Sequence, residues 1–159
     1  DGRWFTNTAW GRTRLRQEIP DDGALTAYLK PQWRWLDAIQ NDFAARADWC
    51  VKPFAEANPP PRIILRGPSD RVARPGEIVT LEASVSDPDG DELVYRWWQY
   101  EEAGTAETVV KLETDAGDPG RARFVVPDET GRTLHLVFEA TDRGSPALTR
   151  YQRVVFQLR

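Results

Sequence analysis

Short apolar stretches separated by glycine- and proline-rich turns fill the sequence from residue 62 to residue 159, and this pattern constrains the fold more than any other feature. The stretches are rich in Val, Leu, Ile, Phe and Tyr, a composition that is typical of β-strands. Seven strands are predicted: Arg62–Arg66, Ile78–Val85, Leu93–Tyr100, Thr108–Leu112, Arg121–Val126, Leu134–Thr141 and Thr149–Leu158. About seven short strands at this spacing indicate an immunoglobulin-like β-sandwich, so a mainly β fold is expected.

The parity of the apolar residues predicts which face of each strand lies in the core, because side chains alternate between the two faces of a strand. Trp97, on the third strand, lies where sandwiches of this type bury a Trp. The predicted inward-facing residues are Val79, Leu81, Ala83, Val85, Leu93, Tyr95, Trp97, Leu134, Leu136, Phe138, Ala140, Val154, Phe156 and Leu158.

The opposite parity places aromatic residues on the outer face of the same strands. The outward patch would consist of Trp98, Tyr100, His135, Tyr151 and Arg153, if the third, sixth and seventh strands share a sheet. Aromatic rings suit the C–H face of a sugar, and an arginine adds polar contacts. Exposed apolar patches mark interfaces of either kind, so this patch is predicted to be a carbohydrate-binding face or the place where another domain docks.

Upstream of residue 58, one segment has the period of a long helix, from about residue 31 to residue 52. Its apolar residues recur at steps of three and four: Leu36, Ile39, Phe43, Ala47, Cys50 and Phe54. An amphipathic helix is stabilised by burying its apolar face, so a partner is expected to cover this stripe, with Cys50 as a small buried hydrophobe. The rest of residues 1–57 is mostly irregular, which favours the end of a larger domain or an appendage packed on the sandwich.

Composition argues against several functions. The chain has 21 basic and 25 acidic residues, a net charge of −4, and no block of about five or more like charges, which argues against a nucleic-acid partner. No apolar run approaches the ~18 residues that span a bilayer, so no membrane insertion is expected. A single Cys allows no intramolecular disulfide. The absence of Met leads us to expect a mature or excised fragment of a longer protein.

The sequence Asp87-Pro88-Asp89-Gly90-Asp91 is the best-defined candidate for a metal site. Ca²⁺ takes about six to eight oxygen ligands, and the three carboxylates of this loop would converge on it. Asp142 lies in a segment that resembles the cadherin stretch whose Asp ligates Ca²⁺, and it would be a fourth ligand. The alternative is a tight turn whose carboxylates cap backbone N–H groups, with no cofactor required.

No catalytic residue is predicted within this chain. His135 lies in mid-strand, and no recognised motif places a Ser or Cys nucleophile beside it. Trp4 and Trp10, in the irregular stretch, are candidates for lining a sugar cleft in a parent domain. The chain alone is therefore expected not to be an enzyme.

A set of motifs extends over most of the chain: Trp10–Arg12, Ala38–Arg46, Asp48–Cys50, Asn58–Pro60, Asp87–Asp91, Thr141–Asp142 and Leu148–Tyr151. Together they resemble the C-terminal part of the cellulose-binding proteins, a family whose members carry an N-terminal domain similar to nucleoside hydrolases. The resemblance implies that residues 1–57 close that domain, that residues 58–61 form a proline-rich linker, and that residues 62–159 form an appended immunoglobulin-like module. It also implies a bacterial protein that is secreted or periplasmic.

From these features we expect a non-catalytic accessory module that braces the nucleoside-hydrolase-like domain of its parent protein and contacts polysaccharide. Two alternatives stay open. One is a Ca²⁺-dependent, cadherin-like adhesion or spacer module with Asp87, Asp89, Asp91 and Asp142 as ligands. The other is part of a glycosidase whose active site lies mostly outside this chain.

Overall fold

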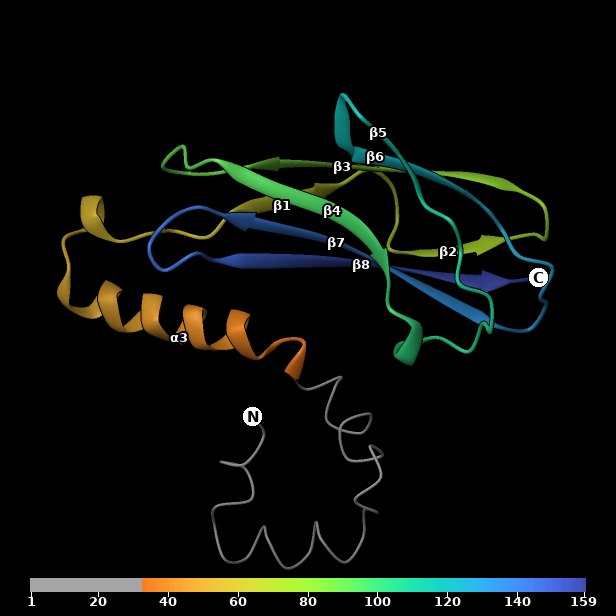
Figure 1. Ribbon diagram of the computed structural model, residues 1–159, viewed down its shortest axis with the longest axis horizontal. Helices are drawn as coiled ribbons and strands as arrows, with labels where there is room; N and C mark the ends of the chain where they lie inside the picture. The colour runs from red at the N-terminus through yellow and green to blue at the C-terminus, as the bar shows by residue number, and fades with distance from the viewer. Residues whose placement is uncertain (1–32) are drawn as a thin grey trace, which may run out of the picture. The chain divides into compact units, whose positions relative to one another are not determined.

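The computed structural model describes residues 33–159, in which one helix is followed by eight strands (Figure 1). Two short 3₁₀ helices accompany them, η2 (Phe54–Glu56) after the helix and η3 (Glu101–Ala103) after the fourth strand. The helix and the strands are α3 (Leu36–Val51), β1 (Arg62–Leu65), β2 (Asp70–Ala73), β3 (Ile78–Ser86), β4 (Leu93–Gln99), β5 (Glu113–Asp115), β6 (Asp118–Val125), β7 (Thr133–Asp142) and β8 (Thr149–Leu158).

The strands form two four-stranded sheets, which confirms the predicted mainly β sandwich. The first sheet has the order β1-β3-β6-β5, and the second has the order β2-β8-β7-β4. Strands β4, β7 and β8 therefore lie next to one another, as the prediction of the outward patch required. Among the described residues, no helix is long and apolar enough to cross a membrane.

The core lies between the two sheets and contains the residues that strand parity predicts, except Leu93, together with Ala122 and Phe124 of β6, which were not predicted. Leu81 of the first sheet and Leu134 of the second are fully buried. Trp97 is 5% exposed, and its indole Nε1 donates a hydrogen bond to the carbonyl of Gly120 at 2.9 Å, which links the two sheets. Its ring lies 4.9 Å from the ring of Phe138. The partly buried residues packed against this core include Ala83, Val85 and Tyr95.

One strand was not predicted from the sequence. Strand β2 contains only two apolar residues, Val72 and Ala73, and therefore lacks the composition of a buried strand. It pairs in parallel with the end of β8, from Val155 to Leu158. The backbone ladder, rather than apolar side chains, gives this strand its place at the edge of the second sheet.

The prediction of a strand at Thr108–Leu112 was wrong. The strand in this part of the chain is β5, which begins one residue after this segment ends, at Glu113, and lies at the edge of the first sheet. Side chains rather than a neighbouring strand satisfy the backbone of this segment. The N–H of Thr108 donates to Oε1 of Glu129 at 2.8 Å, and the N–H of Val110 donates to Oε1 of Gln99 at 2.8 Å. Such local side-chain partners compete with a sheet ladder for the same N–H groups.

Helix α3 buries a different face from the predicted one. Ile39 is 60% exposed, Phe43 is 75% exposed and Phe54 is 91% exposed, so the apolar stripe is not covered within the described residues. Cys50 is also exposed, which contradicts its prediction as a buried hydrophobe. The buried position of the helix is Ala45, which is 1% exposed. Because residues Ala38–Arg159 form one compact unit, the contacts of this helix face with the sandwich lie within a single body.

Candidate functional site

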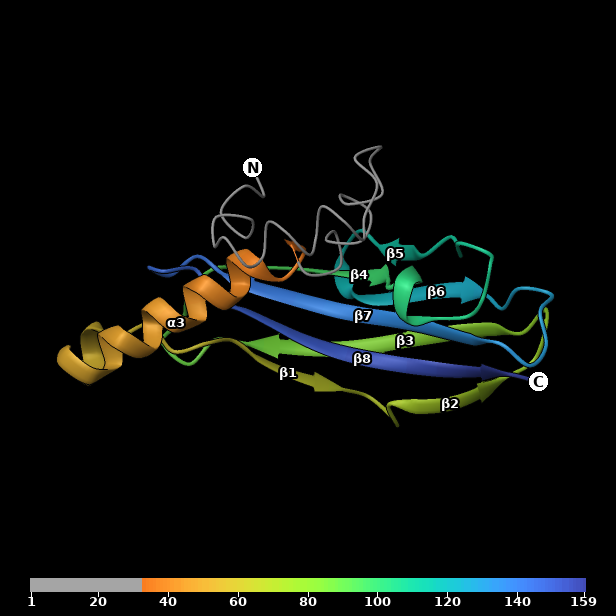
Figure 2. The ribbon, with the colours of Figure 1, turned by 90° about the horizontal axis from the view of Figure 1, so that it is seen from below.

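Hydrogen bonds attach the inner face of α3 to the end of the sandwich where β7 turns into β8 (Figure 2). Nδ2 of Asn41 donates to the carbonyl of Ala147 at 2.9 Å. Nη2 of Arg150 donates to the carboxylate of Asp42 at 3.0 Å. Asn41 and Asp42 lie one turn before Ala45, so small and polar residues form this face and allow the helix to approach the loop closely.

Asn58 fixes the segment that follows the helix. It is 7% exposed, and its Nδ2 donates to Oδ1 of Asp142 at 3.2 Å and to the carbonyl of Pro146 at 2.8 Å. Its own carbonyl accepts a hydrogen bond from Nε1 of Trp49 at 2.9 Å. The first residue of the predicted proline-rich linker is thus tied to both the helix and the sandwich. No periodic pattern pointed to Asn58, because its partners are distant in sequence.

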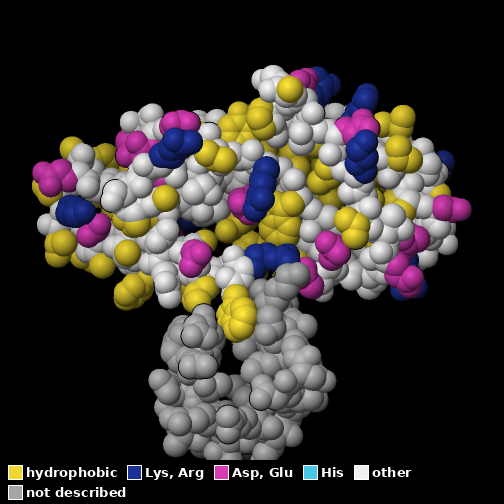
Figure 3. Space-filling model, viewed as in Figure 1, with side chains coloured by type: hydrophobic (Ala, Val, Ile, Leu, Met, Phe, Trp, Pro, Cys, Tyr) yellow, Lys and Arg dark blue, Asp and Glu magenta, His cyan; other side chains and the backbone are white. Residues whose placement is uncertain are grey.

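The outward face of α3 and η2 carries a row of exposed apolar side chains, here named the outer stripe: Ile39, Phe43, Cys50, Val51 and Phe54. Val51 is 81% exposed. Hydrophobic side chains gather along the edge of the molecule that α3 occupies in Figure 3. A row of exposed apolar residues of this length is a mark of an interface.

The aromatic residues predicted to face outward do lie on one face of the second sheet. Trp98 of β4 and Arg153 of β8 both pair in register with Val137 of β7, and His135 lies two residues away on the same face. The ring of Trp98 lies 5.7 Å from that of Tyr100, with 54° between the ring planes. Val137 is only 2% exposed although it points away from the core. This aromatic face is therefore closely packed rather than bare.

Tyr151 lies on the same face, where it pairs in register with Glu139, and Glu139 forms an ion pair with Arg96 at 3.2 Å. Burial, and then the charge of Glu139, raise the pKa of Tyr151. Burial, and then the charge of Arg153, lower the pKa of His135. Both effects keep the two side chains uncharged at neutral pH, which suits packing against an uncharged surface.

His135 has no catalytic arrangement around it within the described residues. Its Nδ1 is buried and has no hydrogen-bond partner there. A catalytic base is normally oriented by a hydrogen bond to one ring nitrogen while the other meets a nucleophile or substrate. Trp4 and Trp10, the predicted cleft residues, lie outside the described residues.

The acidic turn brings three of the four predicted metal ligands together. Oxygen atoms of Asp87, Asp89 and Asp91 lie within 4.8 Å of one another. Oδ1 of Asp87 accepts hydrogen bonds from the backbone N–H groups of Asp89, Gly90 and Asp91 at 3.2, 3.1 and 3.1 Å. These bonds are the backbone caps that the alternative interpretation predicts.

Crowding in the acidic turn moves the pKa values of Asp87 and Asp89 in opposite directions. The hydrogen bond with Asp87, followed by burial and by the negative charges of Asp87 and Asp91, raises the pKa of Asp89 to about 6. Burial acts to raise the pKa of Asp87, but the hydrogen bond from Asp89 and the backbone N–H groups lower it overall. Crowded carboxylates behave in this way because a proton relieves their repulsion.

Asp142 does not belong to the converging set of the acidic turn. It is 1% exposed, and its Oδ1 accepts from Asn58 and from the backbone N–H groups of Gly144 and Leu148 at 3.0 and 2.8 Å. Its carboxylate therefore closes the loop between β7 and β8, and it supports the attachment of α3.

Comparison with known proteins places these features in a family. The chain matches the family described as "Cellulose-binding protein Sde0182, C-terminal domain" over residues 78–158. It is 34% identical to a solved nucleoside hydrolase-related hypothetical protein from Saccharophagus degradans that is associated with carbohydrate metabolism, with a TM-score of 0.72. That match covers 79% of this chain and 32% of the other, so the chain spans about a third of the relative's length.

Two cadherin structures have lower similarity. The protocadherin GammaB4 extracellular domain is 18% identical, with a TM-score of 0.35 and coverage of 62% of this chain and 16% of that one. Human CDH23 EC21-23 is 21% identical, with a TM-score of 0.38 and coverage of 62% and 35%. No curated protein matches the chain. On the family match and the Saccharophagus relative, the chain belongs to the family of the C-terminal domain of the cellulose-binding protein Sde0182.

Proposed function

We propose that this chain is a non-catalytic accessory module that braces the nucleoside-hydrolase-like domain of its parent protein through α3, and that also contacts polysaccharide. The observation that carries the proposal is the division of α3 into two faces. One face is hydrogen-bonded to the sandwich through Asn41 and Asp42, and the other presents the outer stripe.

The preceding domain of the parent protein is the partner that fits the outer stripe. The Saccharophagus relative is nucleoside hydrolase-related, and this chain covers only 32% of it. A parent of similar length would contain a large domain before the sandwich. Full burial of an exposed Phe contributes roughly 1.5–3 kcal/mol, so the two phenylalanines of the outer stripe offer a substantial part of a stable interface.

The attachment of α3 makes the helix a brace rather than a tether. Asn58 and Asp142 are both buried and hydrogen-bonded to each other, so the helix and the sandwich move as one body. A domain docked on the outer stripe would then be held in one orientation relative to the sandwich. A flexible linker at residues 58–61 would not provide this.

The polysaccharide part of the proposal is supported by the family's description, which names cellulose binding, and by the relative's association with carbohydrate metabolism. Because polysaccharides of this kind lie outside the cytoplasm, the proposal includes a secreted or periplasmic location. The non-catalytic role is supported by the isolation of His135, whose Nδ1 has no partner among the described residues.

The bracing role is tested by substitutions in the outer stripe, made both in the full-length parent protein and in this chain alone. We expect Phe43→Ser and Phe54→Ser to lower the melting temperature of the parent but to leave that of the isolated chain unchanged, since both side chains are exposed there. Ile78→Ser is the matched control, because Ile78 is 69% exposed on the first sheet. Equal melting temperatures for all parent variants would refute the brace, and so would an isolated chain that forms dimers through the outer stripe.

A further inference from the structure

We propose that a polar groove on the outer face of the first sheet binds an uncharged polysaccharide chain. The inference rests on the polysaccharide part of the proposed function, but it assigns the contact to a surface that the sequence did not indicate. It places the contact away from the aromatic face.

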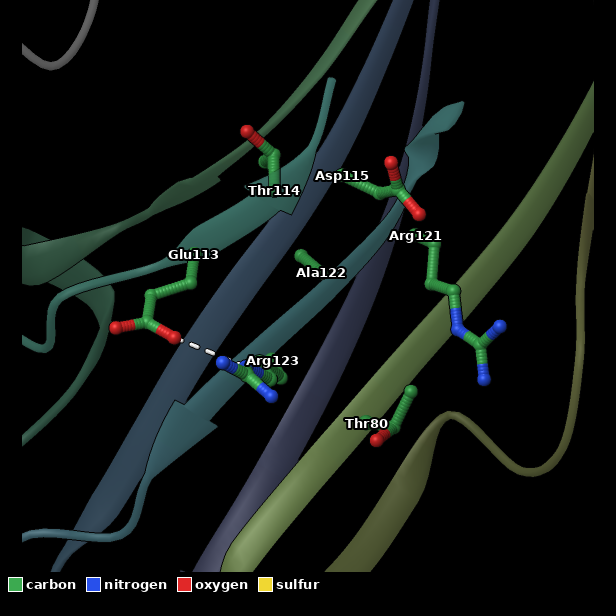
Figure 4. A pocket seen from close by; sticks show the side chains of 7 residues that line it. All are labelled: Thr80, Glu113, Thr114, Asp115, Arg121, Ala122 and Arg123. Atoms are coloured by element: carbon green, nitrogen blue, oxygen red, sulfur yellow. Dashed lines mark hydrogen bonds and ion pairs between the residues drawn. The ribbon is translucent and has the colours of Figure 1, made fainter. Parts of the chain in front are cut away.

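The groove consists of two adjoining hollows of about 490 and 570 Å³. Arg121 lines both hollows, and Figure 4 shows it together with the other residues that line the first. The first hollow lies over β5, β6 and β3, and the second lies over β3 and β1 and reaches Asp118. The path crosses four strands, and the three spacings between them give it a length of roughly 14 Å. This length accommodates several sugar rings rather than one.

Ordered ion pairs form the floor of the groove. Nε of Arg123 lies 2.9 Å from Oε2 of Glu113, and Thr80 pairs in register with Arg123 from the next strand. Glu82 holds two arginines, with Arg121 at 3.3 Å on one carboxylate oxygen and Arg66 at 3.3 Å on the other. These cross-strand pairs orient the planar groups without a bound ligand.

The same groups keep unused hydrogen-bonding capacity toward solvent. A guanidinium carries five N–H donors, and the side chains of Arg121, Arg123 and Arg66 are 57%, 68% and 84% exposed. Adjacent hydroxyl groups of a sugar both donate and accept, so they match a surface on which guanidinium donors alternate with carboxylate acceptors. Hydrogen bonds to charged groups are about twice as strong as those between neutral groups. Ile64, 68% exposed at one end of the groove, offers an apolar contact for a ring face.

The charge of the groove selects an uncharged chain. Its lining contains three arginines and four carboxylates, so the net charge is −1: Arg66, Arg121, Arg123, Glu82, Glu113, Asp115 and Asp118. A polyanion such as a uronate or sulfate polymer would be repelled by the carboxylates, which outnumber the arginines in the lining. A neutral glucan meets no such penalty.

Affinity electrophoresis of the 159-residue chain in native gels tests the groove, with hydroxyethylcellulose as the neutral probe and carboxymethylcellulose as its anionic counterpart. We expect hydroxyethylcellulose to retard the chain and carboxymethylcellulose not to. Arg121→Gln and Arg123→Gln should each weaken retardation by about tenfold or more, because each removes a charged hydrogen-bond donor. Thr80→Ala should weaken it without a change of charge.

Two control variants match these changes. Arg153→Gln removes the same charge from an exposed arginine of the second sheet, and Trp98→Ala tests the aromatic face. Both should leave retardation unchanged. If Trp98→Ala abolishes retardation and the groove variants do not, the groove is refuted while polysaccharide contact stands. If the unaltered chain is not retarded by hydroxyethylcellulose, both are refuted, and stronger retardation by carboxymethylcellulose would overturn the preference for a neutral chain.

Discussion

Asn58 and Asp142, which are 84 positions apart in the sequence, form a buried hydrogen bond of 3.2 Å between the end of the helical segment and the end of β7. The Asp142 carboxylate also accepts two backbone N–H groups of its own loop. Asn58 in turn accepts from Trp49 of α3. This pair therefore couples the orientation of the helix to the conformation of the β7–β8 loop.

Asn58→Ala should destabilise the isolated chain. The substitution removes two donated hydrogen bonds and leaves Asp142, which is 1% exposed, with one donor fewer. Leaving a buried polar group without its partner costs about 1–3 kcal/mol, and that decrease in the free energy of unfolding is expected in urea denaturation. Gln152→Ala, at an exposed position of β8, is the control and should change little. A variant as stable as the unaltered chain would mean that the pair does not hold the helix.

The ion pair between Asp42 and Arg150 should make the attachment of α3 depend on pH. The hydrogen bond from Arg46 is the largest cause that lowers the pKa of Asp42 below its ordinary value of 3.8, and Arg150 lowers it further. An acid whose folded pKa is depressed stabilises the fold above its unfolded pKa, and this contribution is lost as pH falls from 3.8 through the lower folded value. Asp42→Asn should therefore cost about 0.5–1 kcal/mol at pH ~7, and the difference should disappear in strong acid.

The control for this prediction is Asp48→Asn. Asp48 pairs with Lys52 at 2.8 Å within the same helical segment, so its loss affects the helix without touching the sandwich. The measurement is urea unfolding of both variants across the acid range. If the two variants lose the same stability at every pH, the Asp42–Arg150 contact between helix and sandwich contributes nothing specific.

In the acidic turn, we expect Asp89 to titrate at an unusually high pH for an aspartate. Asp89 should titrate with a pKa of about 6, and Asp87→Asn should return it toward the ordinary value of 3.8, because the hydrogen bond with Asp87 is the largest cause of the shift. Carboxyl carbon chemical shifts measured by NMR across the pH range report this directly. The raised pKa means that protonated Asp89 stabilises the fold at low pH, and that this contribution is lost as pH rises from 3.8 to about 6.

The same titration tests the calcium interpretation. A bound Ca²⁺ favours the ionised carboxylates, so millimolar Ca²⁺ would lower the pKa of Asp89 if the three aspartates hold the ion. A titration curve that is the same in Ca²⁺ and in EDTA would exclude a site of useful affinity in this loop. A midpoint near 4 without Ca²⁺ would instead contradict the raised pKa of Asp89.

Local patterns predicted the sandwich, whereas long-range polar contacts determined what the sequence did not reveal. The alternation around Trp97 and Phe138 identifies core faces because it depends only on the geometry of a strand. The face of α3 that is buried could not be found in this way. Its apolar stripe is free of the sandwich, and the contacted face contains Asn41 and Asp42, whose partners lie more than 100 positions away.

The same contrast separates the two candidate surfaces, the aromatic face and the groove. Parity and strand order together placed Trp98, His135 and Arg153 on one face. The groove around Arg121 was missed because alternating charged residues on an outer strand face are what any solvated sheet displays. Only the pairing of β3, β5 and β6 brings Thr80, Arg121 and Glu113 together.

Trp97→Ala should be among the most damaging single substitutions, with a loss of about 3–5 kcal/mol in the free energy of unfolding. The change removes a large buried ring that packs 4.9 Å from Phe138, and it also removes the hydrogen bond to Gly120 that joins the two sheets. Trp97→Phe keeps most of the apolar volume but loses the donor, so it should cost less. Urea denaturation of both variants separates packing from hydrogen bonding. If the two variants lose equal stability, the hydrogen bond to Gly120 rather than the volume of the ring is the main contribution of Trp97, because that bond is what both substitutions remove.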